Sequence, residues 1–247
     1  MKTATHTLEV WGELACFSRP EMKVERFSYP VITPSAARGI FDAIYGKPVE
    51  FRWQIERVEV LPPKTAGSRS SAPSYIALRR NEVKEKVSVT LVAQWMKGKS
   101  PPQPIFADSD GESTGRTQRQ TMALRDVHYR LHARVIPWPG FEAMQPAFDE
   151  QFRRRASKGK CFYQPFFGCR EFPAWFELCE PGAAEPPPVA LDLDIGLMLY
   201  DVFNLSRPGH STDRPYITLF RARVEKGVLE VPSFGDPAVI KPPGGAA

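Results

Sequence analysis

The stretch DVHYRLHARV, from Asp126 to Val135, alternates strictly between two kinds of side chain. Its odd-numbered positions are apolar, and its even-numbered positions are basic or titratable: His128, Arg130, His132 and Arg134. A β-strand places successive side chains on opposite faces of a sheet. The chain is therefore expected to fold around a sheet that has one apolar face and one basic face.

Other segments have the patterns of regular structure. Strands are predicted at 7–16, 51–61 and 87–96, and a short helix is predicted at 145–156. The clearest helix runs from Thr33 to Gly46, because Thr33 is a good N-cap and a proline follows at the first helical position. In this helix Tyr45 is expected at the C-terminal end, off the apolar stripe, and Arg38 is expected to face outward.

The rest of the chain completes a prediction of the fold. Residues 97–120 are polar and rich in Pro, Gly and Ser, which predicts a mobile loop, and 181–190 reads as a turn-rich connection. The last strands are predicted within 195–205 and 216–232, with a hairpin turn at Lys226-Gly227. The order of elements predicts an α+β protein. It has a ferredoxin-like (RRM-type split βαβ) domain at 1–180 with an open sheet face, and a small β-rich region at 181–247.

Composition excludes several classes of function. No apolar run is long enough for a membrane span, so no membrane partner is expected. The chain has 4 cysteines, none in a C-x-x-C pair or near clustered histidines, which favours reduced thiols in a cytoplasm and no zinc site. Phosphate-binding glycine motifs and the G-x-S-x-G motif are absent, and no metal or cofactor is predicted. The formal net charge of +5 favours a polyanionic partner.

The stretch RRRASKGKCFYQPFFGCREF, from Arg153 to Phe172, places basic side chains beside aromatic ones. Lysine and arginine contact phosphates, and unpaired bases stack on aromatic rings. Gly159, between two lysines, would let the backbone approach a phosphate closely. We therefore predict an RNA-binding corner here. The predicted RNA contacts in the whole chain are Arg38, His128, Arg130, His132, Arg153, Arg154, Arg155 and Lys160.

Several long runs resemble one known family. They include ERFSYPVITPSAARGIFDAIYGKP, QRQTMALRDVHY, FRARVEKGVLEVP and the basic stretch already quoted, in the same order along the chain. From about Leu8 to Pro232 the sequence resembles the CRISPR-associated Cas5 proteins of subtype I-C, in the repeat-associated (RAMP) superfamily. The resemblance implies a ferredoxin-like fold and metal-independent cutting of the CRISPR precursor transcript beside its repeat hairpin. It also implies that the protein stays on the 5′ handle of the guide RNA, among the other subunits of the type I-C interference complex.

The resemblance also assigns site residues. In the family a tyrosine at the end of the first helix works with a Lys-His pair at the start of the second, and the tyrosine corresponds to Tyr45. The pair has no counterpart, because the matching positions fall near Ala147 and Phe148. Lys158 is our first choice for stabilising charge on the reacting phosphate. The remaining candidates are Lys160, Tyr163, His128 and His132.

Two other functions fit the same residues. One is a non-catalytic subunit that binds the RNA handle after another nuclease has cut. The other is a general nucleic-acid-binding protein whose basic surface also accepts duplex DNA. Neither requires an acid-base pair, so both remain open.

Overall fold

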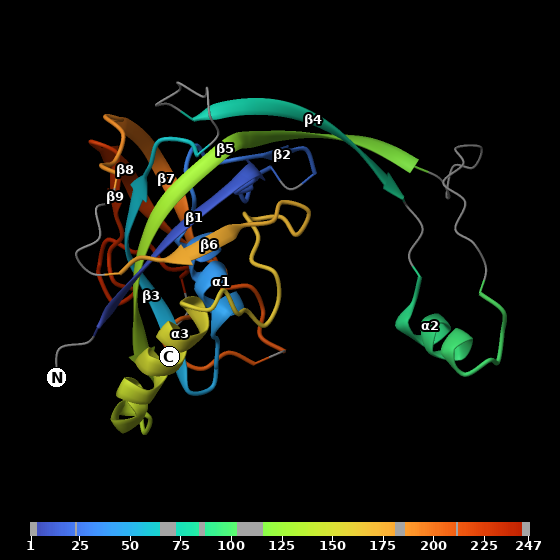
Figure 1. Cartoon of the computed structure of the whole chain (residues 1–247). Coiled ribbons are helices and arrows are strands. Elements are labelled where there is room, and N and C mark those ends of the chain that lie inside the picture. Colours follow the sequence, from blue (N-terminus) through green and yellow to red (C-terminus); the bar gives the residue numbers. More distant parts are fainter. Residues whose placement is uncertain are drawn as a thin grey trace. The chain divides into compact units, whose positions relative to one another are not determined.

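The structure is a computed structural model that describes residues 4–22, 24–64, 73–83, 87–102, 116–180, 186–210 and 212–243 (Figure 1). The chain divides into two compact units, Met1–Ile76 with Met122–Ala247, and Ala77–Thr121. The elements follow in the order β1 (Thr5–Ala15), β2 (Arg26–Phe27), α1 (Pro34–Ile44), β3 (Phe51–Val60), β4 (Ser74–Val83), α2 (Val89–Met96), β5 (Arg116–Pro137), the 3₁₀ helix η1 (Glu142–Met144), α3 (Gln145–Ala156), β6 (Trp175–Leu178), β7 (Leu193–Asp201), β8 (Thr218–Glu225) and β9 (Val228–Glu230).

One large sheet organises the larger unit. Its strands lie in the order β6-β1-β5-β3-β9-β8-β7, and each neighbouring pair along this path is antiparallel. The C-terminal strands thus continue the sheet of the N-terminal ones through the pairing of β9 with β3. The expected mixture of helices with a large antiparallel sheet is confirmed. The division of the chain into folding units at residue 180 stays a prediction.

The core of this unit lies between the sheet and two helices on one of its faces. Trp53 of β3 contacts Phe41 of α1 and Phe152 of α3, with ring centroids 4.9 and 4.6 Å apart. Phe41 also stacks on Phe152 at 5.5 Å, so α1 and α3 lie side by side on the sheet (Figure 1). All three side chains are fully buried, so this aromatic cluster contributes to the hydrophobic stabilisation of the core.

Both helices of this layer begin and end close to the predicted residues. The Thr33 side chain accepts a hydrogen bond from the Ala36 N–H at 3.3 Å, which confirms the N-cap of α1. Helix α3 spans Gln145–Ala156, and its buried residues are Phe148, Phe152 and Ala156. The predicted hairpin is confirmed too, since Lys226 and Gly227 both have positive φ between β8 and β9.

The smaller unit contains the main errors of the prediction. Residues 87–96 were expected to form a strand, but α2 occupies 89–96. The apolar residues of this run fit both the two-residue period of a strand and the 3.6-residue period of a helix. The feature that distinguishes them is Ser88, whose hydroxyl accepts a hydrogen bond from the Leu91 N–H at 3.1 Å and so caps the start of the helix. Strand β4 was not predicted. The loop expected at 97–120 is too long, because β5 begins at Arg116; residues 103–115 lie outside the described residues.

No helix among the described residues is both long and apolar enough to cross a membrane.

Candidate functional site

Tyr45 is the C-cap residue of α1, as its position in the sequence predicted. Its carbonyl oxygen accepts a hydrogen bond from Trp53 Nε1 at 2.8 Å, which ties the end of the helix to the aromatic core. Its ring lies 5.4 Å from Phe51 and 6.5 Å from Phe162. The residue is only 5% exposed, so neighbouring aromatic rings bury it although it was expected to lie off the apolar stripe of α1.

The surroundings of Tyr45 determine its protonation. Burial raises the pKa of its hydroxyl, and the positive charges of Lys47 and Arg155 only partly oppose this shift. A tyrosine whose pKa lies above its ordinary value near 10 keeps its proton at neutral pH. Tyr45 is therefore suited to donate a hydrogen bond, and it is unsuited to remove a proton.

Arg155 joins the end of α3 to the end of α1. Its Nε donates to the Ile44 carbonyl oxygen at 2.6 Å, and its guanidinium lies 4.0 Å from the centre of the Phe162 ring. The Phe162 N–H in turn donates to the Ala43 carbonyl oxygen at 2.7 Å. A cation at these carbonyl groups interacts favourably with the negative end of the helix dipole. We call Tyr45, Arg155 and Phe162, with Lys158 and Lys160 of the intervening turn, the α1–α3 corner.

The predicted basic residues divide between two roles. Lys158 and Lys160 are exposed in the turn after α3, where Gly159 has φ +60° and open space around it. Arg153 and Arg154 are exposed on α3 itself. Arg155 is partly buried and holds two elements together. Lys47, two residues after Tyr45, was not predicted at the site; its charge acts to lower the pKa of the Tyr45 hydroxyl, and its Nζ lies 2.9 Å from Glu50 Oε1.

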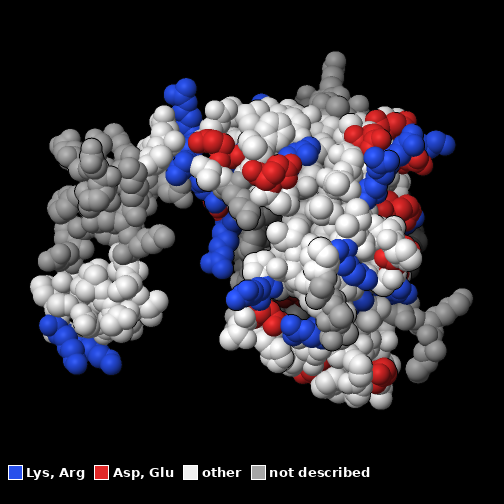
Figure 2. Space-filling view, turned by 180° about the vertical axis from the view of Figure 1, so that it is seen from behind, with Lys and Arg blue, Asp and Glu red and all other residues white. Residues whose placement is uncertain are grey.

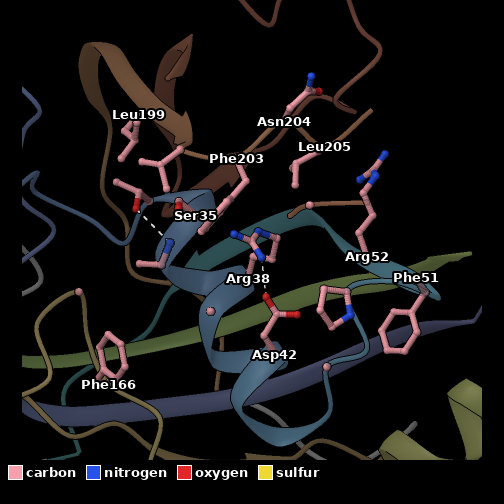
Figure 3. A pocket seen from close by; sticks show the side chains of 18 of the residues that line it. Ser35, Arg38, Asp42, Phe51, Arg52, Phe166, Leu199, Phe203, Asn204 and Leu205 are labelled. Carbon is pink, nitrogen blue, oxygen red and sulfur yellow. Dashed lines mark hydrogen bonds and ion pairs between the residues drawn. The ribbon is translucent and has the colours of Figure 1, made fainter. Parts of the chain in front are cut away.

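A large cavity lies beside this corner. Its volume is about 990 Å³, and its walls come from α1, the segment 162–168 and the segment 199–210 (Figure 3). Arg38 and Asp42 point toward one another at its centre, with Phe203 close to Arg38 (Figure 3). Phe162 lines both the cavity and the α1–α3 corner. The two features therefore form one continuous region of the surface.

Arg38 does not face outward as predicted, because acidic partners hold it inside the cavity wall. Its Nε donates to Asp201 Oδ2 at 2.7 Å and its Nη1 donates to Asp42 Oδ2. The side chain is 14% exposed, and that of Asp201 is 2% exposed. Such a buried, doubly paired guanidinium has a fixed position, since breaking either pair would leave a charge without its partner.

The basic face of β5 is not a free basic surface. Arg130 Nη1 lies 2.6 Å from Glu59 Oε2, and His132 Nε2 lies 3.2 Å from Glu59 Oε1. His128 donates from Nδ1 to the Pro62 carbonyl oxygen, and its Nε2 lies 3.0 Å from Glu9 Oε1. Acidic residues of β1 and β3 therefore neutralise this face.

The same face is also covered. His128 and Arg130 are 5% and 4% exposed, and Arg130 Nη2 donates to the Pro186 carbonyl oxygen at 3.0 Å. Burial lowers the pKa of His132, which keeps it neutral. The expectation of an open sheet face is thus wrong at these three residues. In Figure 2, basic and acidic atoms also alternate on the face of the larger unit that it shows.

No group of three or more His, Cys, Asp or Glu side chains suited to hold a metal ion occurs in the part of the chain that the structure describes. The three histidines of the larger sheet each have an acidic neighbour: His6 with Asp149, His128 with Glu9 and His132 with Glu59.

Comparison with known proteins defines the family. The family model described as CRISPR-associated protein (Cas_Cas5) matches residues 6–232. The chain belongs to the CRISPR-associated Cas5 family. Two curated relatives, from Thermus thermophilus and Mannheimia succiniciproducens, are each named CRISPR pre-crRNA endoribonuclease Cas5d. The first is 39% identical over 92% of this chain and 90% of its own length, and the second is 39% identical over 92% and 94%.

Solved structures support the fold. A structure titled as a CRISPR-associated protein has a TM-score of 0.59 and 17% identity, with 96% of each chain covered. A functionally uncharacterized protein from Streptococcus mutans also has a TM-score of 0.59, with 18% identity over 96% of this chain and 97% of its own. At these identities the likeness shows that this Cas5 chain shares their fold.

Proposed function

We propose that this chain is an endoribonuclease of CRISPR defence, which cuts precursor CRISPR RNA at the repeat hairpin and stays bound to the 5′ handle. The observation that carries the proposal is the identity of 39% over 92% of the chain to relatives named pre-crRNA endoribonucleases. The α1–α3 corner adds a second support, because the tyrosine implied by the family resemblance lies there beside Arg155.

The proposed reaction uses the RNA as its own nucleophile. The 2′-hydroxyl of the ribose before the scissile bond loses its proton and attacks the adjacent phosphorus. The bond from phosphorus to the 5′-oxygen then breaks, and that oxygen takes up a proton. The products are a 2′,3′-cyclic phosphate and a 5′-hydroxyl. This chemistry needs groups that move protons and groups that stabilise negative charge on the phosphorane, and Tyr, Lys and Arg side chains supply both without a metal ion.

The corner residues suit particular steps. We assign to Tyr45 the orientation of the attacking hydroxyl or of a phosphate oxygen through its phenolic proton, since burial raises its pKa. Lys158 is exposed in the turn next to Arg155 and is assigned to stabilise charge on the phosphorane. Arg153, Arg154 and Lys160 are assigned to phosphate contacts that position the transcript. His128, Arg130 and His132 have no place in this proposal, because Glu9, Glu59 and backbone carbonyl oxygens already hold these side chains.

The fold supports the proposal through its chain order. The elements β1-α1-β3 and β5-α3-β6 interlock in the sheet order β6-β1-β5-β3, with both helices on one face. This is the order of a split βαβ unit, so we describe this part of the larger unit as ferredoxin-like. In this chain the bonds from Arg155 to the Ile44 carbonyl oxygen and from Phe162 to the Ala43 carbonyl oxygen bring the end of α1 and the turn after α3 together, which is where the corner lies.

A non-catalytic handle-binding subunit is the alternative that one observation favours. The family's Lys-His pair corresponds to positions near Ala147 and Phe148, and Phe148 is buried against Phe51 with ring centroids 4.8 Å apart. No acid-base pair can act from there. The other subunits of a type I-C interference complex remain the proposed protein partners in either case, and duplex DNA is a further proposed ligand.

Cleavage of repeat RNA in excess chelator tests the proposal. We expect the purified protein to cut labelled repeat RNA once, and to leave intact a copy with a 2′-deoxynucleotide at the cleavage position, because that copy lacks the nucleophile. Tight binding of both RNAs without cutting would instead favour the handle-binding subunit. Equal affinity for unrelated DNA duplexes would favour a general nucleic-acid-binding protein.

Charge reversal on α3 tests the RNA-binding surface. The double change Arg153→Glu and Arg154→Glu is expected to weaken binding of repeat RNA. It should also make the slope of log affinity against log salt concentration less steep, by the amount that about two lost phosphate contacts would give. Both side chains are exposed, so the fold should tolerate the change. Arg221→Glu with Arg223→Glu on β8 is the matched control, since these side chains are exposed outside the corner. Binding titrations at several salt concentrations measure the salt dependence of affinity for the α3 variant and for the β8 control. The same salt dependence in both variants would contradict the assignment.

A further inference from the structure

The cavity beside the α1–α3 corner contains a rigid polar pair on an otherwise mostly apolar wall. Arg38 is held by three hydrogen bonds, of which two go to Asp201 and one goes to Asp42 Oδ2. A guanidinium has five N–H donors, so Arg38 keeps donors beyond those three bonds. Asp42 is 28% exposed and has a second carboxylate oxygen, so the pair presents donors next to an acceptor on the cavity wall.

Exposed aromatic side chains lie next to this pair. Phe203 is 55% exposed, and the Arg38 guanidinium lies 5.3 Å from the centre of its ring. Tyr163 lines the same cavity and is 51% exposed. Burial raises the pKa of the Tyr163 hydroxyl, and the charges of Asp42 and Arg38 also act on it, which places it near the pair. Folding leaves these rings in water, although burying each of them would be favourable.

These features match the way proteins hold single bases of RNA. Unstacked bases lie against aromatic rings or arginine planes, while polar groups read their hydrogen-bonding edges. The volume of about 990 Å³ is at the upper end of the range for small-molecule pockets, so the cavity has room for a nucleoside with its phosphates. A structural core would instead close around such rings and leave no space.

We propose that this cavity binds one unstacked guanine base of the bound RNA, with the base against Phe203 and its edge against Arg38 and Asp42. The carboxylate of Asp42 accepts from N1–H and the 2-amino group of guanine, and a free N–H of Arg38 donates to O6. Adenine has an acceptor at N1 and lacks the 2-amino group, so it cannot donate to the carboxylate in this way. The inference rests on the proposed function only in that the RNA supplies the base.

The test is a binding cycle between Phe203→Ala and abasic sites in the RNA. The probe is uncleavable repeat RNA, with a 2′-deoxynucleotide at the scissile position and one base at a time removed. Loss of one stacked base costs about tenfold to a hundredfold in affinity. We expect Phe203→Ala to weaken binding of the intact RNA by that factor. One of the abasic RNAs should bind the wild-type protein as weakly as the intact RNA binds Phe203→Ala. The Phe203→Ala variant should bind that abasic RNA with the same affinity as the wild-type protein does.

Two variants serve as controls. Trp175→Ala removes an aromatic side chain of similar exposure, 56%, from β6 outside the cavity and should leave binding unchanged. Phe203→Tyr keeps the ring and should restore binding. Wild-type affinity in Phe203→Ala would overturn the proposal. So would the finding that, for every abasic RNA, the loss of affinity from the missing base adds to the loss from Phe203→Ala. A wild-type protein that neither binds nor cuts repeat RNA would instead refute the proposed function.

Base identity is tested at the position that the cycle selects. Guanosine is expected there, and inosine, which lacks the 2-amino group, should bind the wild-type protein several-fold more weakly. Asp42→Asn should lose this discrimination, because an amide cannot replace a carboxylate that accepts both bonds. Selection of another base, or equal affinity for guanosine and inosine, would overturn the guanine assignment.

Discussion

Gly168→Ala is expected to lower the free energy of unfolding by about 2 to 5 kcal/mol, which is a large part of the stability of an ordinary domain. Gly168 has φ +78°, and a Cβ added there would lie 2.1 Å from the Cys16 carbonyl oxygen. That oxygen belongs to the backbone just after β1, and it cannot move without breaking the bond from the Cys16 N–H to the Phe167 oxygen at 3.0 Å. Urea denaturation measures the loss.

Gly159→Ala is the matched control for this change. Gly159 also has positive φ, +60°, but nothing lies within 4 Å of an added Cβ. Only the conformational cost of about 1 to 2 kcal/mol should remain. The difference between the two variants isolates the steric clash. If Gly168→Ala is no less stable than Gly159→Ala, the close approach of segment 162–173 to the end of β1 is incorrect.

Tyr45→Phe is expected to slow cleavage of repeat RNA by about a hundredfold or more, with RNA affinity changed by less than about twofold. Phenylalanine keeps the ring contacts with Phe51 and Phe162, and the backbone bond from Trp53 is unaffected. Only the phenolic proton is lost. Single-turnover cleavage and equilibrium binding, measured on the same preparation, separate the two effects.

The pH dependence identifies the role of the phenol. Burial raises the pKa of Tyr45 above its ordinary value near 10, so the hydroxyl is protonated throughout the neutral range. The factor lost in Tyr45→Phe should therefore be constant across that range. A defect that grows with pH would indicate a tyrosinate acting as base. Tyr216→Phe, a half-buried tyrosine far along the chain, should cleave at the wild-type rate.

The α1–α3 corner was predictable in its parts, and the pairing of those parts was not. Thr33, the apolar stripe and the following glycine mark α1 from local signals alone, and a helix from about Gln145 to Ala156 was predicted in the same way. That Arg155 caps the end of α1 depends on contact between residues 111 positions apart. No local pattern distinguishes this arginine from Arg153 and Arg154 beside it.

The cavity depends even more on contacts between residues that are far apart in the chain. Arg38 and Asp42 are one helical turn apart, so their pairing can be expected from spacing. Asp201 ends β7 and Phe203 follows it, and only the folded chain brings them to α1. The outward direction expected for Arg38 was wrong because a helix pattern cannot include a partner from a distant strand.

Local order, the alternation of β5 and family membership follow from the sequence by itself, because helix caps, strand periodicity and shared runs act over short stretches of chain. The tertiary structure alone decided which charged residues are free. The alternating face of β5 looks like a basic surface when it is read as one strand, but β1 and β3 place Glu9 and Glu59 against it. A buried charge is stable only with an opposite charge beside it, and the partner is chosen by the pairing of strands far apart in the chain.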